Sequence, residues 1–171
     1  MLSNRASEAL RPMVMTLRII VVALSLGVLS FGMFAAVQNA SKLQTFGTKV
    51  NYLFLAIAAP MFVAGFVVPR LLPKGGMRQS QGAGTNDSED VAAVQAAFTA
   101  IQTATIVGCA LFEGAAFANL VAYFMDAELV HLAISGVALL CILAHFPLAS
   151  RVEQQIEDQL QARRDDQQFK K

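Results

Sequence analysis

One carboxylate stands out among the side chains of this sequence that could do chemistry. Glu113 lies near the middle of the apolar stretch 106–124 and is the only acidic residue inside any long apolar stretch. An ionisable group at membrane depth is costly unless it is neutral, paired or hydrated, so it is a candidate functional group by default. Gln102 shares its helical face, and Asn119 lies on a different face. We therefore take Glu113, Gln102 and Asn119 as the candidate ion-binding or buried polar residues.

Three interpretations of Glu113 are open. Desolvation disfavours the charged form of a carboxyl group, so a neutral acid would hydrogen-bond to another helix as a structural clasp. In the second interpretation, the carboxylate exchanges a proton or a cation along a transport path. In the third, it contacts a partner subunit or a ligand. No basic residue lies at mid-depth in the other apolar stretches, which argues against an ion pair within one chain.

Small residues recur every four positions along the same stretch. This small-residue ridge consists of Ala110, Gly114, Ala118 and Ala122. Such spacing lets another helix backbone approach closely, which is how membrane helices associate. The pattern predicts helix packing along the ridge, within one chain or between chains.

The other reactive side chains form no pattern typical of catalysis or of metal binding. His131 and His145 are fourteen residues apart on one expected helix, about 21 Å, so they cannot share a metal, and we expect both near the membrane interface. Cys109 and Cys141 lie in apolar stretches and are expected to be reduced packing residues. We expect no enzyme, no cofactor and no metal, and the net charge of +1 argues against a nucleic-acid partner.

The composition indicates a membrane protein. Hydrophobic residues make up 56% of the 171 positions and charged residues only 15%, against about 25% charged residues in soluble domains. Four apolar runs approach the length of about 20 residues that crosses a bilayer. They cover approximately 19–37, 50–68, 106–124 and 129–144. The sequence therefore predicts an all-α, four-helix transmembrane bundle with cytoplasmic helical extensions, embedded in the lipid bilayer.

The segment between the second and third runs predicts the end of one helix, a loop, and the start of a long helix. Prolines and glycines over 69–76 are expected to end the second helix, and a flexible Gly/Ser-rich loop covers 74–88. Ser88 is the expected N-cap of a helix that ends near Met125. The first part of this helix is amphipathic, with one side formed by Val91, Val94, Phe98 and Ile101.

A short polar helix is expected after the fourth run. Ser150 and Glu153 match a capping box, and Val152, Ile156 and Leu160 form a thin apolar stripe. We therefore divide the chain into a four-span membrane domain, 1–150, and a polar cytoplasmic helix and tail, 151–171.

The basic residues predict the orientation, because cytoplasmic loops carry an excess of Lys and Arg. Lys42 and Lys49 would lie on the outer side. The remaining basic residues would lie on the other side: Arg5, Arg11, Arg18, Arg70, Lys74, Arg78, Arg151, Arg163, Arg164, Lys170 and Lys171. Both termini and the 74–88 loop are therefore expected to be cytoplasmic.

Three groups of residues carry a resemblance to a known family: Val67-Val68-Pro69-Arg70-Leu71, then Ala110-Leu111-Phe112-Glu113-Gly114-Ala115-Ala116-Phe117 with Asn119 and Ala122-Tyr123, and then Phe146-Pro147 with Ser150-Arg151-Val152-Glu153. In these residues the chain resembles a family of small, uncharacterised four-span bacterial inner-membrane proteins. The resemblance implies a multi-pass protein of the bacterial inner (cytoplasmic) membrane, and it implies no function.

A second, local resemblance concerns the Glu113 helix. Ala110-Leu111-Phe112-Glu113, followed by Leu120 and Val121, is similar to the ion-carrying helix of the rotor-ring subunit c of ATP synthases. That likeness implies that Glu113 binds a translocated ion. The chain departs from the subunit c pattern in its long Gly/Ser linker and in having only Gly65 and alanines where the family's preceding helix carries a dense glycine ridge.

These observations favour a non-enzymatic membrane protein that assembles with itself or with a membrane partner. In this hypothesis the small-residue ridge packs helices and Glu113 fixes their register by a hydrogen bond. The alternative is a proton- or cation-translocating membrane subunit with Glu113 as the exchanging carboxylate. Conduction needs further polar residues on facing helices, and the first run offers only Ser25 and Ser30 and the fourth only Ser135.

Overall fold

The described part of the chain consists of long α-helices and contains no strand. The computed structural model describes residues 4–42, 52–76 and 87–148, together with positions 151, 152, 154–156, 158 and 161. The helices are α1 (Asn4–Gln38), α2 (Tyr52–Gly76), α3 (Asp87–Asp126) and α4 (Leu129–Ala144). The all-α prediction is confirmed for these residues.

Several sequence predictions concern positions outside the described residues. These are residues 77–86 of the 74–88 loop, Lys49, Leu160, the capping box of Ser150 and Glu153, and the tail beyond 161. The predicted and observed boundaries of the third helix agree closely. α3 begins at Asp87, one residue before the expected N-cap Ser88, and ends at Asp126 instead of Met125.

α1 and α3 are much longer than one bilayer crossing requires. α1 has 35 residues and α3 has 40, which correspond to about 50 and 60 Å, against a hydrocarbon core of about 30 Å. α1 begins at Asn4 and passes through Pro12, because one missing backbone donor does not end a helix whose other hydrogen bonds remain. α2 likewise continues through Pro69 and Pro73 to Gly76, beyond the end of its apolar run.

Three of the helices are long and apolar enough to cross a membrane. The qualifying stretches are Leu10–Gln38, Tyr52–Leu71 and Val94–Asp126, with mean hydropathies of 2.4, 2.1 and 1.6. α4 is apolar but has only 16 residues, about 24 Å, which is shorter than a typical hydrocarbon core. The membrane and helix predictions are thus met by three helices, and the fourth span stays a prediction.

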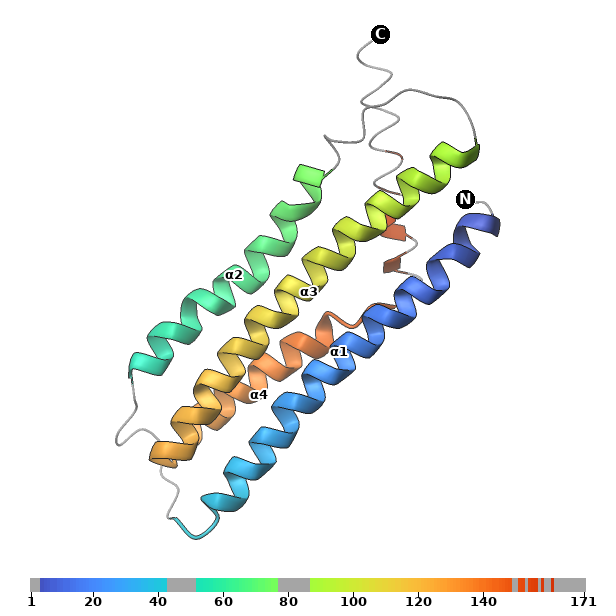
Figure 1. Cartoon of the computed structure of the whole chain (residues 1–171). Helices are drawn as coiled ribbons and strands as arrows, with labels where there is room; N and C mark the ends of the chain where they lie inside the picture. The colour runs from blue at the N-terminus through green and yellow to red at the C-terminus, as the bar shows by residue number, and fades with distance from the viewer. Residues whose placement is uncertain are drawn as a thin grey trace.

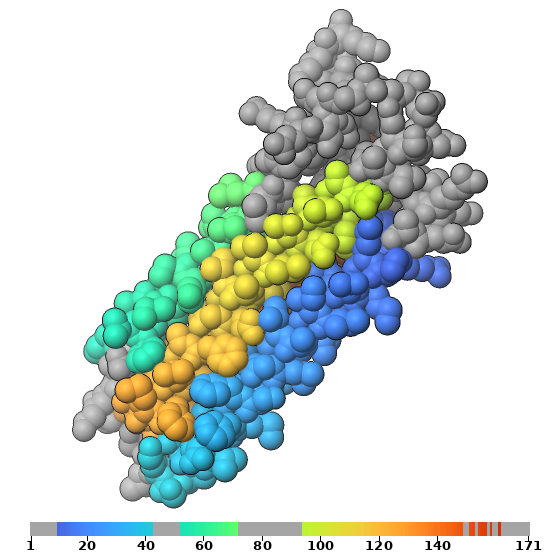
Figure 2. Space-filling view, viewed as in Figure 1, coloured from blue at the N-terminus to red at the C-terminus, as the bar shows by residue number. Residues whose placement is uncertain are grey.

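α3 is the central helix of the bundle. It packs against each of the other three helices, and α1 also contacts α4. Figure 1 shows α2 and α1 on opposite sides of α3, with α4 behind them. The space-filling view in Figure 2 leaves a strip of α3 uncovered between α2 and α1. The helices alternate in direction, so α1 and α3 begin at the same end of the bundle, where α2 and α4 finish (Figure 1).

Two apolar clusters hold the helices together. The first packs the beginning of α1 and the beginning of α3 against the C-terminal segment, and consists of Leu10, Val14, Val94, Ala97, Phe98, Ile101, Val152 and Ile156. This agrees with the predicted apolar side of the third helix and with the stripe after the fourth run. The second joins α1, α3 and α4 through Val21, Val28, Cys109, Phe112, Ala116, Leu120, Ala138 and Ile142.

The contact between α2 and α3 depends on two glycines. A Cβ atom added to Gly65 would lie 2.8 Å from Cζ of Phe112, and one added to Gly108 would lie 2.9 Å from Cγ of Pro69. The Phe112 ring is fully buried and also packs edge-on against Phe62 and Phe66. The absence of side chains at these two glycines therefore sets how closely α2 approaches α3.

Candidate functional site

Glu113 lies on the side of α3 that faces α1. It is half-buried, and a Cβ added to Gly27 of α1 would lie 3.7 Å from its Oε1 atom. The carboxylate is thus placed beside a position of α1 that carries no side chain. Within the described part of the chain it forms neither a hydrogen bond nor an ion pair. Its hydrogen-bonding capacity is therefore unused by these residues.

The structure does not gather the three candidate polar residues into one site. Gln102 is half-buried and shares a face with Glu113, but eleven residues separate them, about 16 Å along the axis. Asn119 is fully buried and faces α4, where its Oδ1 lies 3.0 Å from Nδ1 of His131. Glu113 thus belongs to the contact between α1 and α3, and Asn119 belongs to the contact between α3 and α4.

Asn119, His131 and Ser135 form a buried polar bridge between α3 and α4. Nδ2 of Asn119 donates to the carbonyl of Ala115 at 3.0 Å. The hydroxyl of Ser135 lies 3.1 Å from the carbonyl of Ala116 and 2.8 Å from that of His131, and its single proton is shared between these acceptors. The bridge connects the two helices by polar contacts that an apolar surrounding strengthens.

His131 lies between α4 and α3, a contact that the sequence analysis did not predict. Its side chain is fully buried, and its Nε2 atom has no hydrogen-bond partner among the described residues. The sequence located His131 only by its depth, near the start of a helix. The turn at Ala127, with a φ of 56°, folds α4 back along α3 and places His131 between them. His145 is half-buried, as the end of α4 would suggest, and donates to the carbonyl of Cys141 at 2.8 Å.

Asn39 is a structural residue that the sequence analysis missed. It follows the end of α1, is buried, and donates from Nδ2 to the carbonyls of Tyr123 and Phe124 at 2.8 and 3.4 Å. The last carbonyls of a helix lack partners within that helix, so Asn39 satisfies the end of α3 and fixes α1 to it. A pair of amides, Gln38 and Asn39, at the end of a long apolar run was the available signal.

The small-residue ridge does not form one contact surface. Ala110 is exposed, Gly114 and Ala118 are half-buried, and Ala122 is fully buried. Every fourth residue advances by about 40° around a helix of 3.6 residues per turn, so the ridge winds from the uncovered strip of α3 towards its packed side. A Cβ added to Gly114 would lie 3.3 Å from Cε of Met61, which places this glycine against α2.

The two cysteines and the possible metal ligands can be located among the described residues. Cys109 is fully buried and Cys141 is half-buried, and both are free. No three of the described His, Cys, Asp and Glu side chains lie close enough together to hold a metal ion.

Comparison of the chain with family models, with curated proteins and with solved structures finds no match. Any function must therefore be argued from the residues and their geometry, and the two resemblances described above stay expectations.

Proposed function

We propose that the protein is a four-span, non-enzymatic protein of a bacterial inner membrane that assembles with another membrane helix through the uncovered strip of α3. We assign to this strip five residues that share one face of α3: the exposed Thr103, Ala110 and Val121 and the half-buried Gly114 and Phe117. The other helix belongs to a second copy of the chain or to a partner protein.

The observation that carries the proposal is the unpaired Glu113 carboxyl group beside this strip. A carboxyl group at membrane depth is stabilised when a hydrogen-bond partner meets it, and the described residues supply none. Ala110 is small and exposed, so it lets a second backbone approach within reach of that group. Association of the two helices would then satisfy Glu113 and fix their register.

The distribution of charge supports a membrane orientation with both termini in the cytoplasm. α1 and α3 start, and α2 and α4 finish, at the same end of the bundle (Figure 1). Arg11, Arg18, Arg70 and Arg151 belong to this end, and Lys42 follows α1 at the opposite end. This is the asymmetry that the positive-inside rule associates with a cytoplasmic face.

Proton or cation translocation is the second candidate function. The observation that favours it is the partial exposure of Glu113, which leaves its carboxyl group within reach of a small ion. The polar bridge of Asn119 and His131 contributes nothing to a path through Glu113, because it lies on another face of α3. Assembly therefore ranks above translocation.

Two substitutions at one position separate the two functions. Glu113→Gln keeps a hydrogen-bonding group but cannot exchange a proton, whereas Glu113→Leu removes both capacities. Assembly by hydrogen bonding predicts that Glu113→Gln retains the oligomer and that Glu113→Leu weakens it about threefold to twentyfold, from about 0.6–1.7 kcal/mol per membrane hydrogen bond. Translocation predicts that both variants lose ion flux.

Disulfide crosslinking in membranes provides the readout for self-assembly. Ala110→Cys places an exposed thiol on the α3 strip, and Leu140→Cys is a matched control on an exposed position of α4. Both are made in a chain whose Cys109 and Cys141 are replaced by Ala. Dimers formed by the α3 variant alone support self-assembly. Equal crosslinking at both positions would refute the proposal. The proposal would also be refuted if the Ala110→Cys variant crosslinked neither to a second copy of the chain nor to another protein.

A further inference from the structure

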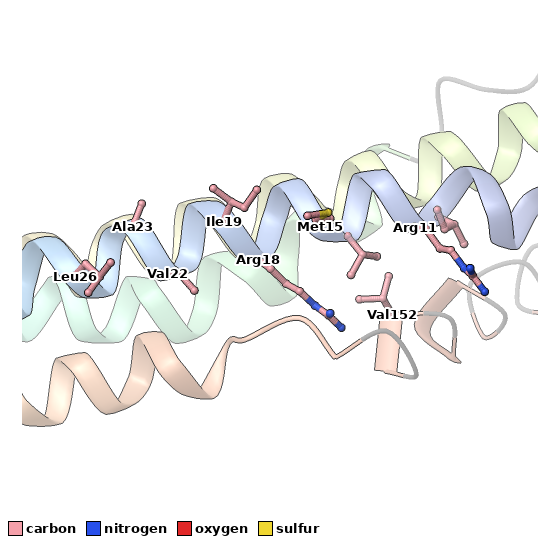
Figure 3. Close-up of a pocket in the computed structure, with 10 residues that line it drawn as sticks. Arg11, Met15, Arg18, Ile19, Val22, Ala23, Leu26 and Val152 are labelled. Atoms are coloured by element: carbon pink, nitrogen blue, oxygen red, sulfur yellow. The ribbon is translucent and has the colours of Figure 1, made fainter.

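A groove runs along the outer side of α1, away from the α3 strip. It has a volume of about 720 Å³, and most of its length is lined by exposed apolar side chains. Met15, Ile19, Val22 and Leu26 form this apolar part. Figure 3 shows Val152 of the C-terminal segment closing the other side near the beginning of the helix.

Two arginines line the half of the groove that is nearer the beginning of α1. Arg11 and Arg18 are seven residues apart, so they project from the same side of α1 about 10 Å apart along its axis. Figure 3 shows both side chains pointing to the side on which Val152 lies. Neither forms an ion pair with a carboxylate in the described part of the chain.

Arg18 is held in place by the segment that follows α4. Its Nε donates to the carbonyl of Pro147 at 3.1 Å, and its guanidinium carbon lies 5.8 Å from the centre of the Phe146 ring. These contacts use Nε and one face of the group, so the two terminal nitrogens keep their donors. Arg18 is thus an oriented cation with unused hydrogen-bond donors.

The order of side chains along α1 matches the order of groups in a phospholipid. The arginines precede the uninterrupted apolar run, where α1 would pass from the headgroup region into the hydrocarbon region. Guanidinium groups bind phosphate oxygens through paired, charge-assisted hydrogen bonds. The exposed chain from Ile19 to Leu26 then offers about 10 Å of apolar surface, parallel to the direction of an acyl chain.

We propose that this groove binds one anionic phospholipid, with its phosphate on Arg11 and Arg18 and an acyl chain along Ile19, Val22 and Leu26. The opposite charges of the headgroup and of the two arginines select an anionic lipid over a zwitterionic one. The proposal rests on the membrane location proposed above and is independent of the assembly of α3.

Tryptophan fluorescence can test the proposal because the chain contains no tryptophan. The full chain carrying Leu26→Trp is placed in phosphatidylcholine vesicles, and brominated phosphatidylglycerol or brominated phosphatidylcholine is added as the quencher. Quenching requires a brominated acyl chain next to the reporter, so free phosphate gives no signal. Each arginine near a membrane surface favours an anionic lipid about fivefold, so the two together predict a preference of about 25-fold.

Substitutions of the arginines test the assignment of the headgroup. Arg11→Gln should lower the preference to about fivefold, and Arg11→Gln with Arg18→Gln should abolish it. Arg70→Gln removes an exposed arginine from α2 and should leave it unchanged. A preference that survives the double substitution, or that Arg70→Gln lowers equally, would overturn the proposal.

A second reporter position separates this proposal from the proposed membrane location. Val63→Trp lies on an exposed part of α2 and should be quenched by both lipids without preference. Absence of quenching at both positions would contradict the membrane location. Quenching at Val63→Trp, with equal quenching by both lipids at Leu26→Trp, would overturn the lipid site alone. Quenching at Val63→Trp with none at Leu26→Trp would show that protein covers the groove, which also overturns the lipid site.

Discussion

The tight approach of α2 to α3 predicts that Gly65→Ala destabilises the bundle. The added methyl carbon would lie 2.8, 2.9 and 3.1 Å from three atoms of the Phe112 ring, whereas ordinary contacts begin at 3.4 Å. The ring cannot easily retreat, because it is fully buried between Phe62, Phe66 and His145, with ring centroids 5.0 to 5.7 Å away. Overpacking of this kind costs about 1–3 kcal/mol.

Gly136→Ala is the matched control for this prediction. Gly136 lies inside α4, and a Cβ added there would meet no atom within 4 Å. Both substitutions share the gain in helix propensity of about 0.8–1.0 kcal/mol, so the difference between them isolates the overpacking cost. We expect Gly65→Ala to have a free energy of unfolding about 1–3 kcal/mol below that of Gly136→Ala.

Titration with sodium dodecyl sulfate in mixed micelles, followed by helical circular dichroism, would measure both free energies of unfolding. The cause is checked by repeating Gly65→Ala in a chain that carries Phe112→Leu, which lacks the ring atoms in question. The cost of Gly65→Ala should then be largely lost, because contacting residues couple in a double-mutant cycle. Equal stability of Gly65→Ala and Gly136→Ala, or an unchanged cost without the ring, would refute the reasoning.

Three further predictions follow from the packing. Asn119→Ala should lower the free energy of unfolding in the same titration by about 0.6–1.7 kcal/mol by leaving Nδ1 of His131 unpaired. Thr99→Ala, at an exposed position of the same helix, should change it little. Ile156→Ala should lower the stability of the packed C-terminal segment by about 2–5 kcal/mol and speed tryptic cleavage after Arg151. Gln155→Ala, at an exposed neighbouring position, should not speed this cleavage. Equal rates of cleavage in the two variants would contradict the first apolar cluster. A membrane-permeant maleimide, followed by mass spectrometry, should label the half-buried Cys141 before the fully buried Cys109.

The existence of the helices and their apolar sides were predictable from the sequence, because both follow from the spacing of hydrophobic residues. The apolar side of Val94, Phe98 and Ile101 was read from spacing alone, and these residues are buried in the first cluster. The continuation of α1 back to Asn4 was not predicted, because its polar first turns carry no apolar signal of their own. The described packing of α1 against α3 and the C-terminal segment begins directly after these turns, at Leu10 and Val14.

The details of helix contacts were less predictable, because they depend on which helices become neighbours. The ridge through Ala110 and Gly114 was visible as a repeat, but Gly65 and Gly108 are the glycines at which a Cβ atom would clash across the contact between α2 and α3. The pairing of Asn119 with His131 needed the turn at Ala127, which sets the register of α4 on α3. A single sequence gives depth along each helix and leaves the pairing of faces undetermined.

The central position of α3 has a consequence for how the protein is made. Within the described residues, α1 and α2 share no substantial contact although they are consecutive in the chain, since both pack mainly on α3. During synthesis the first two helices therefore have no common interface until the third helix is inserted. The hydrogen bond from Arg18 to Pro147, across 129 positions, forms only after α4 as well. A chain that ends before residue 87 would thus contain two helices without a common interface.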